Sequence, residues 1–72
     1  QLFPNPATDI LSIRNNGVIT SMMMYDIYGR LIMTSEINSD ACDLDIGRFP
    51  PGLYILRMTT TSGTFTEKFV KR

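Results

Sequence analysis

Few residues of this 72-residue chain are of a type that could do chemistry. There is no histidine, so the usual general base and most metal-binding constellations are missing. Cys42 is the only cysteine, and no internal disulfide can form. Ser12, Ser21 and Ser62 lie in strand or turn contexts without a nucleophile-elbow motif. A hydrolytic triad cannot be assembled, and we expect no catalytic residues.

Three aspartates, Asp40, Asp43 and Asp45, lie close together and could offer oxygen ligands to calcium. In "ACDLDI", however, the last two alternate with apolar residues, which is typical of a strand with one wet face and one apolar face. The glycine and glutamate of a calcium loop are also missing. We therefore expect no metal and no cofactor. Cys42 shares the apolar phase and is interpreted as a core residue, with a reactive thiol as the alternative.

Exposed aromatic residues are the remaining candidates for a binding role, because small sandwich modules bind sugars on such side chains. Tyr25, Tyr28 and Phe49 are the candidates here. Each is also explained as a packing residue of a hairpin or an anchor of a turn, and the chain has no tryptophan.

Size and composition indicate one folded domain over residues 1–72. The chain is 43% hydrophobic and 19% charged with zero net charge, which argues against disorder and against binding to nucleic acid or a membrane surface. No apolar stretch is long enough to span a bilayer. The chain starts with Gln1 and shows no leader, so we expect a piece of a longer precursor.

Apolar residues recur with period two in short runs separated by turn residues, the pattern of an all-β fold. We predict a small antiparallel β-sandwich of the immunoglobulin or fibronectin-III kind with six to eight short strands. The predicted strands are residues 10–14, 19–27, 30–36, 41–45, 53–60 and 64–71. The predicted turns are residues 15–17, 28–29, 38–40, 50–52 and 62–63.

Residue types predict the geometry of several turns. Residues 27–29 fit a hairpin with glycine in the left-handed region at Gly29. Pro51 and Gly52 suit the centre of a type II turn, and Asn16 and Gly17 a reversal after the first strand.

Strand alternation then predicts which side chains face the core. Tyr54, Leu56 and Met58 share one side of their strand, and we place them in the core. Met22 and Met24 are expected to point inward too.

The two ends of the chain have distinct patterns. Pro4 and Pro6 bracket Asn5 and predict a stiff leading segment over residues 1–8, with Asp9 turning the backbone into the first strand. In the last strand both faces mix apolar and charged residues, which suits a sheet edge. The charges there either protect the edge or present it to a partner. Residues 46–72 carry five basic residues against Glu67 alone, whereas residues 1–45 carry two against six acids.

Four motifs in register resemble the C-terminal sorting domain of the type IX secretion system. They are "FPNPATDILSI" (residues 3–13), "MYDIYGRLI" (24–32), "DLDIGRFPPGLYILRM" (43–58) and "EKFVKR" (67–72). The resemblance covers essentially the whole chain. It assigns a structural role to the residues that open the domain and its hairpins, namely Pro4, Asn5, Pro6, Asp26, Gly29, Gly52 and Tyr54. Departures are mild: Phe3 stands where tyrosine is common, and Cys42 takes an aliphatic position.

The resemblance implies a non-catalytic secretion signal of Gram-negative bacteria. The precursor would fold in the periplasm, and an outer-membrane translocon with its shuttle protein would recognise this domain. A surface sortase-like protease would cleave it off, and the N-terminal cargo would be joined to anionic lipopolysaccharide or released. The expected location is therefore the periplasm in transit, then the cell surface or the extracellular space.

An edge strand can be captured by strand addition, so we predict that the partner contacts the end of the chain. The predicted contact residues are Glu67, Lys68, Phe69, Val70, Lys71 and Arg72, with Lys68 and Lys71 foremost. Weak self-association through the same edge is a further expectation. The alternative function is a carbohydrate-binding or adhesion module that a secreted enzyme retains.

Overall fold

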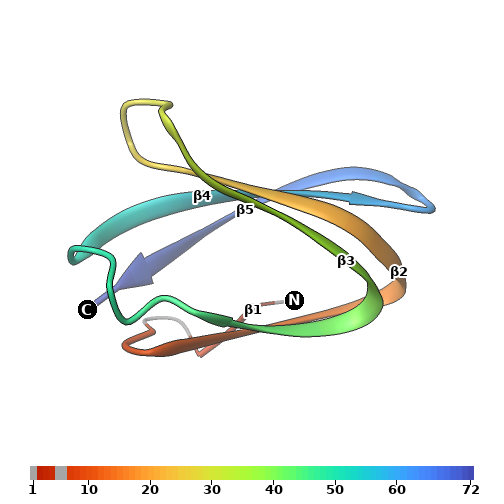
Figure 1. The fold of residues 1–72 in the computed structure, drawn as a ribbon, viewed down its shortest axis with the longest axis horizontal. Helices are drawn as coiled ribbons and strands as arrows, with labels where there is room; N and C mark the ends of the chain where they lie inside the picture. Colours follow the sequence, from red (N-terminus) through yellow and green to blue (C-terminus); the bar gives the residue numbers. More distant parts are fainter. Residues whose placement is uncertain (1, 5–6) are drawn as a thin grey trace.

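The structure, a computed structural model, describes residues 2–4 and 7–72 and consists of five antiparallel strands (Figure 1). They are β1 (Leu2–Phe3), β2 (Ile10–Tyr25), β3 (Leu31–Asp45), β4 (Gly52–Thr60) and β5 (Gly63–Lys71). The predicted all-β antiparallel class is confirmed. Within the described residues, no helix is long and apolar enough to cross a membrane.

The predicted number of six to eight short strands is wrong, because two predicted turns lie inside long strands. Residues 15–17 belong to β2, which is 16 residues long, and residues 38–40 belong to β3, which is 15 residues long. The register between β2 and β3 shifts between Arg14 and Ile19 and again before Ser21, and Asn38 has a φ of 55°. Extra residues around Asn16 on β2 and around Asn38 on β3 therefore interrupt the ladder, and such irregularities bend a strand without ending it.

The hydrogen bonds join all five strands in one sheet, whereas an immunoglobulin-like or fibronectin-III-like sandwich has two. The order is β1-β2-β4-β5, and β3 pairs with β2. The long β2–β3 ribbon curves round at one end of the molecule, on the right of Figure 1, so its two halves lie one above the other. A single bent sheet thus provides the two layers that enclose the core.

The core lies between these layers and consists of one cluster of buried side chains. Leu11 and Ile13 come from the first half of β2, and Met22 and Met24 come from its second half. The predicted inward positions of β2 and β4 are all buried: Met22, Met24, Tyr54, Leu56 and Met58. Cys42 is half-buried and packs against the same cluster. Burial, followed by the neighbouring Asp43 carboxylate, raises the pKa of its thiol, which favours the unreactive protonated form.

Three described residues of the leading segment, Leu2, Phe3 and Ala7, pair with strands of the sheet. Leu2 pairs with Ile13 in β1–β2, and Ala7 is buried beside Lys71 of β5. Pro4 is exposed, and Asn5 and Pro6 lie outside the described residues.

Candidate functional site

Strand β5 lies at the end of the sheet, as the mixed character of both its faces predicted. It pairs with β4 from Gly52 and Lys71 to Thr60 and Gly63 without any shift in register. β4 pairs with β2 on its other side, so β5 has one long neighbour. Its second edge is therefore the part of the strand that the sheet does not cover.

The last residues of β5 are held on this second edge by the leading segment. The Ala7 N–H donates to the Val70 carbonyl over 2.8 Å, and the Arg72 N–H donates to the Ala7 carbonyl over 2.8 Å. Ala7 and Lys71 form a parallel bridge between them. No local sequence pattern predicts this contact, because it joins residues more than sixty positions apart. Ala7 thus closes the second edge of β5 at Val70 and beyond, and the earlier residues of the strand have no strand beside them on that edge among the described residues.

Side chains of the predicted contact residues divide between the two faces of β5. Phe69 is fully buried and stacks on Tyr54 with ring centroids 5.6 Å apart. Lys71 is only 7% exposed, and its Nζ donates to the Arg72 carbonyl over 2.6 Å. Lys68, Val70 and Arg72 are exposed on the opposite face, and Glu67 is half-buried. The side chains of Phe69 and Lys71 therefore hold the strand in place, and the exposed ones are available to a partner.

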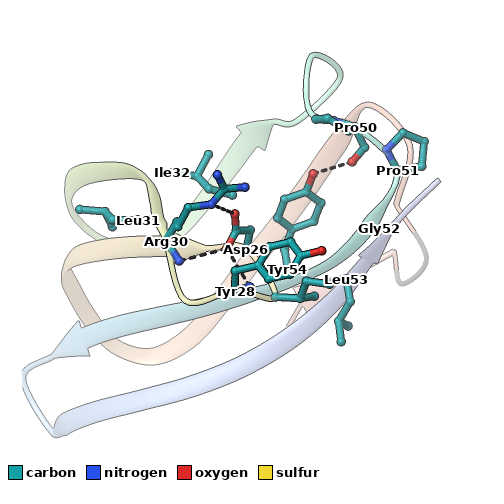
Figure 2. Close-up of a pocket in the computed structure, with 11 residues that line it drawn as sticks. Asp26, Tyr28, Arg30, Leu31, Ile32, Pro50, Pro51, Gly52, Leu53 and Tyr54 are labelled. Carbon is teal, nitrogen blue, oxygen red and sulfur yellow. Dashed lines mark hydrogen bonds and ion pairs between the residues drawn. The ribbon is translucent and has the colours of Figure 1, made fainter.

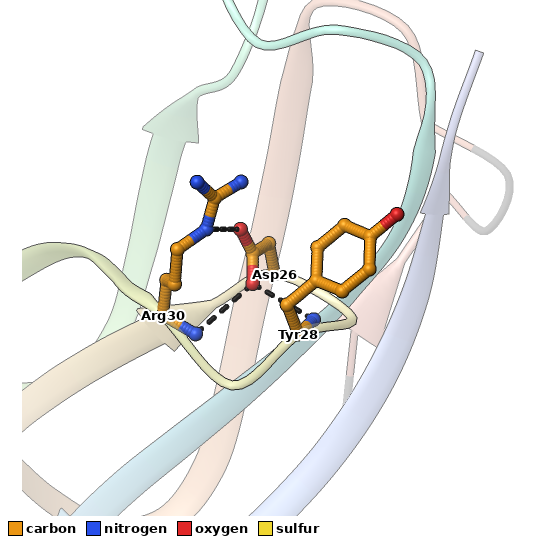
Figure 3. A network of polar contacts seen from close by, with 3 residues as sticks. All are labelled: Asp26, Tyr28 and Arg30. Carbon is orange, nitrogen blue, oxygen red and sulfur yellow. Dashed lines mark hydrogen bonds and ion pairs between the residues drawn. The ribbon is translucent and has the colours of Figure 1, made fainter.

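The hairpin turn predicted at residues 27–29 is present and is built on Asp26 (Figure 3). The Asp26 carboxylate accepts the main-chain N–H of Tyr28 (2.9 Å), the main-chain N–H of Arg30 (3.0 Å) and the Arg30 Nε (2.7 Å). Gly29 has a φ of 81°, the left-handed value expected for a glycine there. Partial burial raises the pKa of Asp26, but the Arg30 and Tyr28 hydrogen bonds and the Arg30 charge hold that pKa below 3.8.

An open groove of about 520 Å³ lies between this turn and the segment that leads into β4 (Figure 2). The Tyr54 hydroxyl donates to the Pro50 carbonyl over 2.5 Å and fixes one side of the groove. Exposed apolar side chains surround it, namely Ile27, Tyr28, Leu31 and Leu53. No local sequence pattern predicts the groove, because its two sides are distant in the chain.

The predicted type II turn at Pro51 and Gly52 is wrong. Gly52 has a φ of 156°, and as the first residue of β4 it already pairs with Lys71 of β5. The chain reverses earlier, where the Phe49 N–H donates to the Ile46 carbonyl over 3.1 Å. Pro51 therefore leads an extended segment into β4, and Tyr54 retains the core position that was predicted for it.

Asp9 and the candidate sugar-binding aromatics have mostly structural contacts. The Asp9 carbonyl accepts the Ile46 N–H over 2.8 Å, which joins the start of β2 to the end of β3. Phe49 lies 5.9 Å from the Tyr54 ring and anchors the turn, and Tyr25 is half-buried. Tyr28 is 78% exposed, with the Arg30 guanidinium 5.5 Å from its ring centroid. Among the described residues, no group of three acidic or cysteine side chains is placed to hold a metal ion.

Comparison with known proteins decides the family. The family model for the secretion system C-terminal sorting domain matches residues 1–72, the whole chain. The chain belongs to this family. The resemblance that four motifs indicated is thereby confirmed, and the sorting domain is a signal and not an enzyme.

The sorting domain is also similar to part of a curated protein, an endo-acting ulvan lyase from Formosa agariphila. The two are 34% identical over 62 residues. The match covers 82% of this chain but only 12% of the lyase, so it concerns a small part of that enzyme.

Proposed function

We propose that this domain directs an N-terminal cargo protein through the type IX secretion system and across the outer membrane. Membership of the sorting-domain family supports this function, and the match to a short part of a lyase is consistent with a tail on a larger cargo. In this proposal the domain folds in the periplasm and is recognised by the outer-membrane translocon and its shuttle protein. A surface sortase-like protease then removes it, and the cargo is attached to anionic lipopolysaccharide or released.

The position of β5 at the sheet edge supports the recognition step, because within the described part of the chain β5 pairs along its length with only one strand, β4. We assign the contact to residues 67–72. Lys68, Val70 and Arg72 present exposed side chains, and the buried side chains of Phe69 and Lys71 keep the strand in its place. Glu67 is half-buried.

Surface delivery of a reporter tests the function. The domain is fused behind a periplasmic reporter in a host that has the secretion system, and the chain is truncated after Phe65. We expect delivery to be lost. Because truncation also removes the buried Phe69, Lys68→Ser serves as a variant that leaves the core intact. Its matched control is Arg48→Ser, which removes one exposed positive charge from a turn. Undiminished delivery of both the truncation and Lys68→Ser would exclude recognition at the end of the chain.

One observation favours a second function, a carbohydrate-binding or adhesion module that stays on a secreted enzyme. Tyr28 is exposed, and Arg30 beside it could donate hydrogen bonds to a sugar. The two functions predict different mature proteins. Mass spectrometry of the secreted product would show residues 1–72 absent if the domain is a cleaved signal and present if it is a retained module.

A further inference from the structure

The main-chain groups on the second edge of β5 can be assigned from the bonds to Ala7. The Val70 carbonyl and the Arg72 N–H point toward Ala7, and therefore away from β4. Because N–H and C=O groups alternate sides along a strand and the β4–β5 register is unbroken, the groups of Thr64, Thr66 and Lys68 point the same way. None of these groups bonds to another described residue. A row of main-chain donors and acceptors is therefore exposed on β5 between Thr64 and Lys68, just before the part of the strand that Ala7 covers.

The side chains beside this row differ between the two faces of the sheet. Lys68 is exposed on the outer face, and so is Arg57, which lies opposite Thr66 on β4. Neither Lys68 nor Arg57 is in an ion pair with a described residue. Among residues 2–4 and 7–72, one ion pair forms, between Asp26 and Arg30. On the inner face Phe65 is 47% exposed, beyond the reach of the core. The outer face suits a negative charge, and the inner face suits an apolar side chain.

We propose that the edge of β5 between Thr64 and Lys68 is a strand-addition site for an extended segment of the export machinery. The segment carries acidic residues toward Lys68 and Arg57 and, at alternate positions, an apolar residue toward Phe65. Strand addition supplies affinity through main-chain bonds, and the alternating side chains supply specificity. This inference rests on the proposed function and deepens it by naming the register and the chemistry of the partner.

The structure favours a different protein over a second copy of this chain as the occupant. Two copies paired edge to edge would bring Lys68 and Arg57 of both onto one sheet face, where like charges repel. The proposed strand-addition site is also separate from the closed end of the edge, where Ala7 is already hydrogen-bonded to the Val70 carbonyl and the Arg72 N–H. The Val70 carbonyl and the Arg72 N–H would become available for main-chain pairing only after Ala7 leaves.

A pair of proline variants tests the site. Thr66→Pro removes an N–H that points away from the sheet, which an edge strand tolerates, but blocks the addition of a strand. Thr34→Pro is the matched control on the other open edge. The Thr66 groups point away from β4, so those of Arg57 point to β2, and those of its partner Met23 point back to β4. Thr34 lies opposite Met23 on β3, so its N–H points away from β2 and out of the sheet as well.

We expect Thr66→Pro to reduce surface delivery of the reporter fusion by about fivefold or more, the effect of losing a main-chain bond at the contact. Thr34→Pro should deliver as the wild type does. Thermal unfolding of both variants should match, and in the wild type the amides of Thr66 and Lys68 should exchange with solvent faster than those of Phe65 and Glu67. Equal delivery by the two proline variants, or slow exchange at Thr66, would overturn the inference.

Two further results separate this inference from the proposed function. If the truncation after Phe65 abolishes delivery while Thr66→Pro does not, recognition at the chain end stands and strand addition fails. If Thr66→Pro does not fold, Lys68→Glu decides: reduced delivery supports the acidic partner, and unchanged delivery overturns it. A dimer in sedimentation that Thr66→Pro abolishes would replace the export machinery with a second copy as the occupant.

Discussion

Tyr54 joins three parts of the molecule through one side chain. Its ring stacks on Phe69 of β5 and lies 5.9 Å from Phe49 in the turn before β4. Its hydroxyl donates to the Pro50 carbonyl over 2.5 Å. The Tyr54 side chain is almost fully buried and Pro50 is exposed, so the bond is only partly shielded from water. Tyr54 therefore fixes β5, the turn and the wall of the groove relative to one another.

Tyr54→Phe should lower the free energy of unfolding by about 1 kcal/mol, because it removes one partly buried hydrogen bond and keeps the stacked ring. Urea titration of the isolated domain measures the effect. Tyr28→Phe is the matched control, since that side chain is largely exposed and its hydroxyl makes no hydrogen bond among the described residues. Equal losses in the two variants would contradict the role assigned to the Tyr54 hydroxyl.

At the scale of the element, the β2–β3 hairpin depends on one carboxylate at its turn. The folded state holds the pKa of Asp26 below its ordinary 3.8, so the ionised form is favoured by folding. The resulting stabilisation is complete well above pH 3.8 and is lost as the pH falls through the lower folded pKa. The turn is thus weakest in acid.

Asp26→Asn should remove this dependence. We expect the melting temperature of the variant to lie below that of the wild type near neutral pH, with the difference shrinking as the pH is lowered below 3.8. Thermal unfolding followed by circular dichroism from pH 7 to pH 2 measures it. A difference that grows on acidification would show that the carboxylate does not stabilise the turn as its contacts indicate.

The strands themselves show how far the sequence predicts this fold. Alternation placed Met22, Met24 and Tyr54 in the core correctly because it depends on the local geometry of a strand. The turn at Gly29 was also predicted, since its φ requirement is local. Asn16 was misassigned to a turn, because the same residue types that reverse a chain also bulge a strand, and the neighbouring strands decide which occurs.

The candidate site was predictable to a similar extent. The mixed faces of the last strand predicted an edge, and that edge is where β5 lies. The burial of Lys71 and the closure of the edge by Ala7 could not be predicted, because both depend on pairing between the two ends of the chain. Lys68 keeps the exposure that a contact residue needs.

At the scale of the whole molecule, one bent sheet and one core replace the disulfides and metals that often support domains of this size. The chain has a single cysteine, so stability depends on packing and on the pairing of the leading segment. Ala7 is fully buried and makes two main-chain hydrogen bonds, one to Val70 of β5 and one to Arg72 just after it. The segment is small, but it secures the strand to which we assign recognition.

Removing residues 1–8 should therefore cost about 2 kcal/mol or more of unfolding free energy, the sum of two main-chain hydrogen bonds and the burial of Ala7. Chemical denaturation of the shortened domain measures the loss. A second deletion, of residues 1–4 alone, keeps Ala7 and serves as the matched control. If the two deletions are equally stable, Ala7 does not secure β5.

The parallel contact between Ala7 and Lys71 also has a mechanical consequence. A pull on the chain ahead of the domain acts first on the short β1–β2 pairing and then on the two hydrogen bonds that join Ala7 to Val70 and Arg72. Those bonds would carry the load before the buried ladder between β4 and β5 does. Traction on a tethered cargo would thus loosen the end of the molecule first and leave its centre folded.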